Sequence, residues 1–225
     1  MLDHYRLKGW CNLKSALLPK DITNLKYYGG KVVKEYLDSH GGFPNWRGVH
    51  TASMYDKHLW YFYTSGMMLH IAENLLETET PWLFNDQLVW KMPESGFGFA
   101  PHTDNSTGVR IWNKTINCLV ILDDINIENG GLMVRNRDNG NWVSPTLKQG
   151  DILCIDGDTE HASGENASDK TRSTYACVYS KEKLEIPNFY QTRFYNEWKE
   201  SEINAKSWYL EKERQEKLSV NESRK

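Results

Sequence analysis

The sequence predicts a mainly β fold with a jelly-roll core, and three observations support this prediction. From Pro81 onwards, short runs rich in Val, Ile, Leu, Trp and Tyr alternate with clusters of Gly, Asn, Asp and Pro, as in successive strands joined by turns. The segments 128–131 and 149–151 are strong turn signals between such runs. Aromatic residues form 12% of the chain and suit a β core. Short strands at this spacing are typical of β-sandwiches and jelly rolls.

The chain length fits a single domain. Its 225 residues are enough for one sizeable core and too few for two full domains. We expect one domain over residues 1–225 in three parts: a helical N-terminal part (1–80), a jelly-roll core (81–180) and a charged, helical C-terminal tail (181–225).

Two helices are predicted in the N-terminal part. Apolar residues recur at helical spacing after Pro19, with an interruption at 29–30 and an end near 41–42. A second helix is predicted over 67–76, and its His70 is interpreted as structural. Near the other end of the chain, residues 195–225 have Lys/Glu spacing typical of an exposed helix.

The core is predicted to contain a series of short strands without internal repeats. They are expected near 83–91, 98–104, 115–122, 131–135, 143–147, 151–155 and 171–179.

Charge and cysteine spacing exclude several classes of protein. A net charge of −3 provides no basic surface for nucleic acid or for an anionic membrane. The four cysteines lie far apart without a C-x-x-C pair, which excludes a zinc knuckle. Cys118, Cys154 and Cys177 each lie in an apolar run, as buried free thiols do. We therefore expect a small-molecule partner.

One short segment contains two candidate metal ligands. His102 and Asp104 lie two residues apart in the predicted strand 98–104, so their side chains should point the same way. Together with one distant histidine, such a pair forms the 2-His-1-carboxylate triad of non-haem iron(II) oxygenases. His161, which closely follows a buried strand, is the candidate third ligand. Arg172 begins the next strand, and its guanidinium can bind a carboxylate through two hydrogen bonds.

A cytoplasmic location is predicted. The N-terminus lacks the apolar stretch of a signal peptide, and no segment has the length and apolarity of a membrane span. The glycosylation sequons are interpreted as chance matches, because two of them adjoin the candidate ligands. They lie at Asn105, Asn113, Asn166 and Asn221.

Several separated motifs agree in order and spacing with one enzyme family. They are Lys91-Met92-Pro93, His102-Thr103-Asp104-Asn105, Leu122-Asp123-Asp124, the run ENGGLMV at 128–134, and HASGEN at 161–166 followed by Arg172. Over roughly residues 80–180 the chain resembles the phytanoyl-CoA dioxygenase-like (PhyH) family of 2-oxoglutarate oxygenases, which includes the ectoine hydroxylases. The chain departs from the family after Val134, where P-G-S-H is usual and Arg135-Asn136-Arg137-Asp138 stands instead. The identity of the substrate therefore does not carry over.

The resemblance implies a fold, cofactors and a reaction. The fold would be a double-stranded β-helix, the jelly-roll core of the cupins. Fe(II) would bind to His102, Asp104 and His161, and Arg172 would bind the far carboxylate of 2-oxoglutarate. With O₂ as co-substrate, the products would be succinate, CO₂ and a small metabolite hydroxylated at an unactivated C–H bond. Related halogenases replace the carboxylate, so Asp104 favours hydroxylation, with desaturation and cyclisation left open.

Further candidates follow from strand faces and motif positions. Gln87 and Lys91 share one face of a predicted strand, and Ser163 matches a family serine. Candidates for cofactor binding are Asn117, Ser163 and Gln87, and candidates for substrate binding are Lys91, Arg110, Trp112 and Arg135.

Two alternatives remain open from the sequence. The first is a cupin-type metalloenzyme that does not use 2-oxoglutarate, for which Arg172 would be dispensable. The second is a non-catalytic jelly-roll binding module, which would bind no iron(II). The oligomeric state is not indicated by the sequence.

Overall fold

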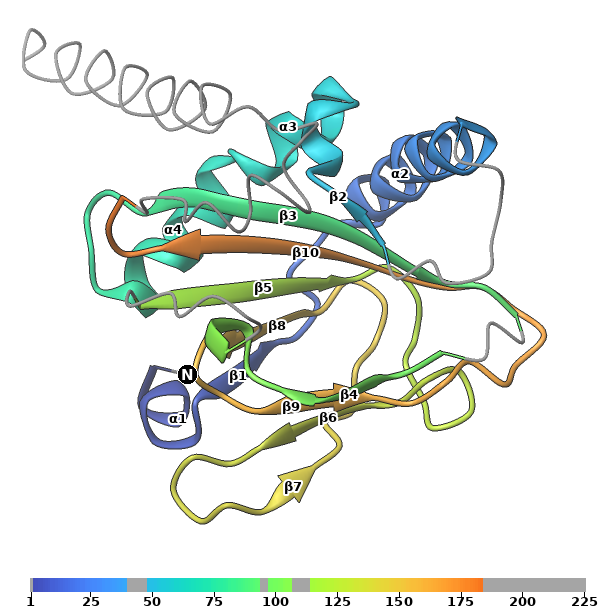
Figure 1. The fold of residues 1–225 in the computed structure, drawn as a ribbon. Coiled ribbons are helices and arrows are strands. Elements are labelled where there is room, and N and C mark those ends of the chain that lie inside the picture. The colour runs from blue at the N-terminus through green and yellow to red at the C-terminus, as the bar shows by residue number, and fades with distance from the viewer. Residues whose placement is uncertain (1, 40–47, 94–96, 107–113, 184–225) are drawn as a thin grey trace, which may run out of the picture.

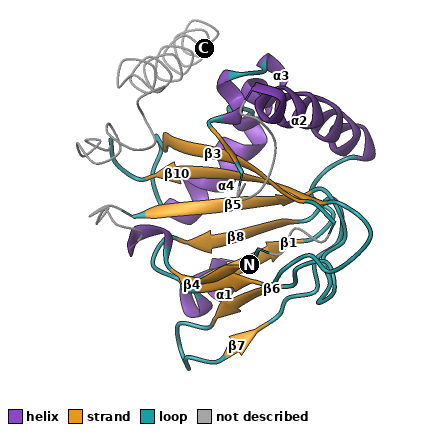
Figure 2. Cartoon of the chain, turned by 45° about the vertical axis from the view of Figure 1, so that its right-hand side comes forward, coloured by secondary structure: helices purple, strands orange, loops and turns teal. Residues whose placement is uncertain are grey.

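Two antiparallel sheets face each other, and most of the helices cover the larger sheet (Figures 1 and 2). The computed structural model describes residues 2–39, 48–93, 97–106 and 114–183. The larger sheet has the strand order β1-β8-β5-β10-β3-β2, and the smaller has the order β4-β9-β6-β7. This arrangement confirms the predicted jelly-roll fold.

The helices have the following bounds: α1 (Leu2–Lys8), α2 (Pro19–Ser39), α3 (Lys57–Tyr63) and α4 (Gly66–Leu76), with short 3₁₀ helices η1 (Ala52–Met54) and η2 (Asp104–Ser106). The strands are β1 (Trp10–Leu13), β2 (Val49–His50), β3 (Trp82–Lys91), β4 (Phe99–His102), β5 (Thr115–Ile121), β6 (Leu132–Arg135), β7 (Trp142–Val143), β8 (Ile152–Asp156), β9 (His161–Ser163) and β10 (Arg172–Ser180). The expected helix near the C-terminus lies outside the described residues.

The larger sheet separates two hydrophobic clusters. Side chains alternate across a strand, so neighbouring residues of β5 enter different clusters. Cys118 and Val120 pack with the helices, whereas Leu119 and Ile121 pack between the sheets. Both faces of β5 are buried, which explains why its sequence is apolar almost throughout.

The N-terminal part contributes two strands that the sequence did not predict. β1 pairs with β8, and β2 pairs with β3. These strands have four and two residues, too few for a recognisable alternating pattern. Their structure depends on the edges of the larger sheet that they cover.

Helix α2 runs continuously through the glycine pair at which an interruption was predicted. A Cβ atom on Gly29 would lie 3.1 Å from Leu88 Cδ2, and one on Gly30 would lie 3.1 Å from Trp90 Cη2. The two glycines therefore allow the helix to pack closely on β3. This packing offsets the low helix propensity of glycine.

Two predicted strands are shorter in the structure. The strand predicted at 98–104 ends at His102, because the chain turns into η2 at Asp104. The strand predicted at 143–147 is reduced to β7, since Pro145 has no N–H for a ladder. The buried free thiols are confirmed, because all four cysteines are free and buried. None of the described helices is both long and apolar enough to span a membrane.

Candidate metal centre

Strand pairing brings the two candidate histidines together. His102 ends β4 and His161 begins β9, and the two residues are direct partners in the ladder between these strands. Their ring centroids lie 4.3 Å apart. Asp104 approaches from η2, so its position depends on a turn and not on the strand alternation that we predicted.

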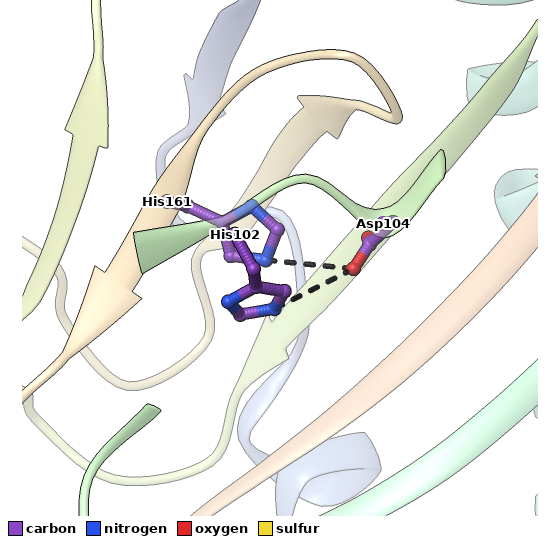
Figure 3. A group of neighbouring side chains, drawn as sticks. All are labelled: His102, Asp104 and His161. Atoms are coloured by element: carbon purple, nitrogen blue, oxygen red, sulfur yellow. Dashed lines mark ion pairs between the residues drawn. The ribbon is translucent and has the colours of Figure 1, made fainter. Parts of the chain in front are cut away.

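The three side chains converge on one point (Figure 3). Asp104 Oδ1 lies 3.8 Å from His102 Nε2 and 3.6 Å from His161 Nε2. Among the described His, Cys, Asp and Glu residues, this is the one group of three whose ligand atoms lie within 4.8 Å of one another. A single ion can therefore reach all three atoms.

Backbone carbonyls orient both imidazole rings. His102 Nδ1 lies 2.7 Å from the carbonyl oxygen of Ala100, and His161 Nδ1 lies 3.1 Å from that of Thr159. Since a carbonyl oxygen only accepts, each Nδ1 carries the proton and each Nε2 keeps its lone pair. Metal-binding histidines are held in this way, so the donor set fits a divalent transition metal.

A buried network fixes the turn that carries Asp104. The backbone N–H of Asn105 donates to the carbonyl of Gly157, and its side chain donates to Asp158. Thr115 Oγ1 donates to Asn105 Oδ1 over 2.9 Å. A Cβ atom on Gly157 would lie 2.0 Å from Thr115 Oγ1, so glycine is required there. These positioning residues were not predicted from the sequence, because their hydrogen bonds join segments that are distant along the chain.

The ligands line a cavity of about 90 Å³ between the sheets. Its polar lining comprises Gln87, His102, Asp104, Asn117, His161, Ser163, Arg172 and Thr174. Its apolar lining comprises Val89, Phe99, Leu119, Leu132, Ile155, Ala162 and Ala176. The predicted ligands and all four predicted cofactor-binding residues thus border one space.

Arg172 is a buried cation in this cavity. Its side chain donates to the carbonyl of Gly130 over 3.1 Å and to Thr174 Oγ1 over 3.4 Å. Within the described part of the chain, no carboxylate lies within ion-pair distance of its guanidinium. Burial lowers the pKa of Arg172 to about 10, and Asp123 opposes this shift only in part.

Lys91 lies behind the cavity wall. It is 0% exposed, and its ammonium donates to Ser163 Oγ over 2.8 Å and to the carbonyl of Gly164. Burial lowers the pKa of Lys91 to about 7, with a further contribution from the positive charge of Arg172. Ser163 borders the cavity whereas Lys91 does not, and the substrate contact of Lys91 stays a prediction.

Among the other substrate candidates, Arg135 does not border the described cavity. Leu132 and Val134 of β6 point inward, so Arg135 points to the outer face. There it pairs with Glu160 over 2.8 Å and donates to the carbonyl of Gly140. Arg110 and Trp112 lie outside the described residues.

Two sequon asparagines have structural roles. Asn105 holds the η2 turn, and Asn166 is 1% exposed. The Asn166 amide donates to the carbonyls of Lys91 and Lys170, both over 2.8 Å, and so holds the loop between β9 and β10. Their burial agrees with the interpretation of these sequons as chance matches.

A family model matches the segment around the second half of this site. Residues 134–174 match phytanoyl-CoA dioxygenase (PhyH). The chain is similar to this family over that segment. The matched segment contains His161, Ser163 and Arg172, while His102 and Asp104 precede it. No curated protein matches the sequence.

Solved structures share the fold of this chain. The α-ketoglutarate-dependent carbocyclase SnoK from nogalamycin biosynthesis has a TM-score of 0.71 and 16% identity, over 85% of this chain and 89% of SnoK. EctD from S. alaskensis in its apoform has a TM-score of 0.70 and 18% identity, over 84% and 81%. The epimerase SnoN, in complex with Fe³⁺, α-ketoglutarate and nogalamycin RO, has a TM-score of 0.67 and 17% identity, over 80% and 82%.

These findings confirm the expected resemblance and the fold. The family match covers the segment with His161 and Arg172, the solved structures share the double-stranded β-helix, and the His-Asp-His group lies at the cavity between its sheets.

Proposed function

We propose that this protein is an Fe(II)- and 2-oxoglutarate-dependent dioxygenase that hydroxylates an unactivated C–H bond of a small metabolite, with succinate and CO₂ as co-products. One observation carries the proposal. The three ligand atoms of His102, Asp104 and His161 lie within 4.8 Å of one another at a cavity that also holds the buried Arg172.

The ligand group has the composition that this chemistry requires. Two imidazoles and one carboxylate on one side of an iron(II) ion leave adjacent positions for 2-oxoglutarate and O₂. When bound, the metal and its co-substrates supply the oxidising chemistry, and the protein supplies position and shielding. His102 and His161 present Nε2 because backbone carbonyls hold their Nδ1 protons.

Arg172 is proposed to bind the far carboxylate of 2-oxoglutarate. A buried guanidinium without a carboxylate partner is costly, and a dicarboxylate would supply the missing charge. Ser163 Oγ already accepts a hydrogen bond from Lys91, so its own proton can be donated to the same carboxylate. Lys91 would add a second positive charge behind Ser163, to which its ammonium donates a hydrogen bond. Gln87 also lines the cavity and stays a candidate for contact with 2-oxoglutarate or with the substrate.

The substrate is proposed to be a small molecule that enters this cavity. The lining combines polar side chains with apolar ones such as Val89, Leu119 and Ile155. Apolar side chains exclude water, which strengthens the polar contacts and limits side reactions. SnoN and SnoK are named as an epimerase and a carbocyclase, so this fold accommodates outcomes other than hydroxylation. The retained carboxylate of Asp104 supports hydroxylation as the proposed outcome.

The proposal is tested by anaerobic titration with Fe(II) and 2-oxoglutarate. The wild-type protein should develop the visible charge-transfer band of a chelated 2-oxoglutarate. His102→Ala should lose the band, and Arg172→Ala should show it only at much higher 2-oxoglutarate concentrations. Arg135→Ala, on the outer face of β6, is the matched control and should behave as wild type.

Two other outcomes would point to the alternatives. Iron binding without any response to 2-oxoglutarate would indicate a cupin-type enzyme of another kind. A wild-type protein that binds no iron(II) would indicate a binding module and would contradict the proposal. Succinate release in a screen of small metabolites would then identify the substrate.

A further inference from the structure

Asn117 is a cavity residue with one half of its amide engaged and the other half unpaired. Its Nδ2 donates to Asp104 Oδ2 over 3.1 Å. Its Oδ1 is buried and has no hydrogen-bond partner among the described residues. Only three buried side-chain polar atoms of the described chain share this property, and that of Asn117 is the one in a residue that lines the metal cavity.

The chemistry of the carboxylate determines the orientation of this amide. An ionised carboxylate only accepts hydrogen bonds, so the NH₂ group of Asn117 must face Asp104. The reversed amide would place two acceptor oxygens against each other. The unpaired Oδ1 is therefore the amide atom turned away from Asp104, in a residue that lines the cavity.

Strand β5 holds the ligand-bearing turn at two successive inward positions. Thr115 Oγ1 donates to Asn105 Oδ1 over 2.9 Å, and Asn117 Nδ2 donates to Asp104 Oδ2 over 3.1 Å. Residues two apart on a strand share a face, so the strand presents two hydrogen-bond donors to two consecutive residues of η2. Of these contacts, the one from Asn117 reaches a predicted ligand directly.

We propose that Asn117 is a positioning residue of the metal site, with a donor and an acceptor role. Its amide nitrogen holds Asp104 Oδ2, so that Asp104 Oδ1 faces the two histidines. Its amide oxygen accepts a hydrogen bond from a proton-donating group in the cavity, either water or an N–H or O–H group of a bound small molecule. This inference rests on the proposed metal site.

The inference changes the role expected for Asn117. From the sequence, this residue was predicted to bind 2-oxoglutarate, and the second N–H of its Nδ2 can still donate to a carboxylate. Its unpaired Oδ1 is an acceptor and requires a partner with a proton to donate. Residues that orient metal ligands in this way usually affect metal affinity about 10- to 100-fold.

Asn117→Leu separates a positioning role from a structural one. Leucine has a similar volume, removes the contact to Asp104 and also removes the unpaired buried oxygen. A positioning role predicts that the melting temperature is unchanged or raised, while affinity for Co(II), used as an air-stable probe, falls about 10- to 100-fold. A structural role predicts a lower melting temperature and unchanged affinity, which would overturn the proposal.

Asn136→Leu is the matched control. Asn136 is also buried, and its Oδ1 accepts from Trp10 Nε1 over 2.9 Å at the edge of the fold. This control should lower the melting temperature and leave Co(II) affinity unchanged. The visible spectrum of bound Co(II) should differ from wild type in Asn117→Leu and agree with it in Asn136→Leu. A wild-type spectrum in Asn117→Leu would overturn the positioning role.

The same titration distinguishes failure of this inference from failure of the metal site. Absence of stoichiometric Co(II) binding by the wild type would overturn the proposed function. Binding by the wild type that is lost in His102→Ala, together with equal binding by Asn117→Leu, would overturn only the role of Asn117.

Discussion

Two tyrosines on one face of the larger sheet and two cavity residues on its other face differ in how their polar groups are paired. On the face toward the helices, the hydroxyl of Tyr175 donates to Asp86 over 2.8 Å, and that of Tyr179 donates to the carbonyl of Tyr63 over 2.7 Å. On the face toward the smaller sheet, Arg172 has no carboxylate partner among the described residues and Asn117 Oδ1 is unpaired. Trp90 Nε1, on the side toward the helices, is unpaired as well, so an unpaired group indicates a place for a ligand only where it lies in a residue that lines a cavity, as in Asn117.

The largest expected effect follows from removing a candidate metal ligand between the two sheets. His161→Ala should abolish Fe(II) binding and 2-oxoglutarate turnover, because two ligands cannot replace three at one ion. The melting temperature of the metal-free protein should change little, since the ring belongs to the cavity lining. Metal content and succinate release measure the first effect, and thermal denaturation measures the second. Full turnover in this variant would contradict the metal site.

On the face of the larger sheet toward the helices, a substitution should lower stability and leave metal binding unchanged. Asp86 accepts hydrogen bonds from the backbone and hydroxyl of Ser53, both over 2.7 Å, and from Tyr175. Asp86→Ala would leave these buried donors unpaired and should lower the free energy of unfolding by about 3 kcal/mol or more. Chemical denaturation measures this loss. Below the new melting temperature, Fe(II) affinity should match wild type. A loss of metal binding without a loss of stability would contradict the difference between the two faces.

Lys91 provides a pH-dependent test of the inner face. The pKa of its buried amine is lowered to about 7, so the proton is lost as the pH rises through this value. If Lys91 assists in binding a dianion, affinity for 2-oxoglutarate should fall between pH 6.5 and about 8. Lys91→Met should bind 2-oxoglutarate more weakly at low pH and lack this dependence. Identical pH profiles for the two proteins would exclude the role of Lys91.

The stability of the ligand-free protein should change with pH in the opposite direction. Between about pH 7 and the ordinary value of 10.5, the unfolded chain binds the Lys91 proton more tightly than the folded chain does. Stability contributed by this group therefore rises with pH across that window. The difference in melting temperature between wild type and Lys91→Met, followed over pH, measures the effect.

The smallest effect is expected at the outer face of the smaller sheet. Arg135→Ala removes an exposed ion pair with Glu160 and should change the free energy of unfolding by about 0.5 kcal/mol or less. Turnover and 2-oxoglutarate affinity should be unaffected. A clear loss of substrate affinity would restore the original prediction that Arg135 contacts the substrate.

Local patterns predicted most of the core strands and the ligands. The long strands β3, β5 and β10 were found within one or two residues, because their apolar runs and turn signals are local properties. β9 has three residues and was missed, although it carries His161. The orientation of Arg135 was available from the sequence as well, since alternation from the apolar Leu132 and Val134 sends it outward.

The sequence by itself therefore determined the type of fold, the three candidate ligand residues and the arginine of the cavity. These features follow from residue type and from spacing over short distances. Only the tertiary structure decided that Ser163 separates Lys91 from the cavity, and that Asn117 contacts Asp104 while leaving one oxygen unpaired. Such contacts depend on which strands pair and which faces meet, and burial then sets their electrostatic consequences.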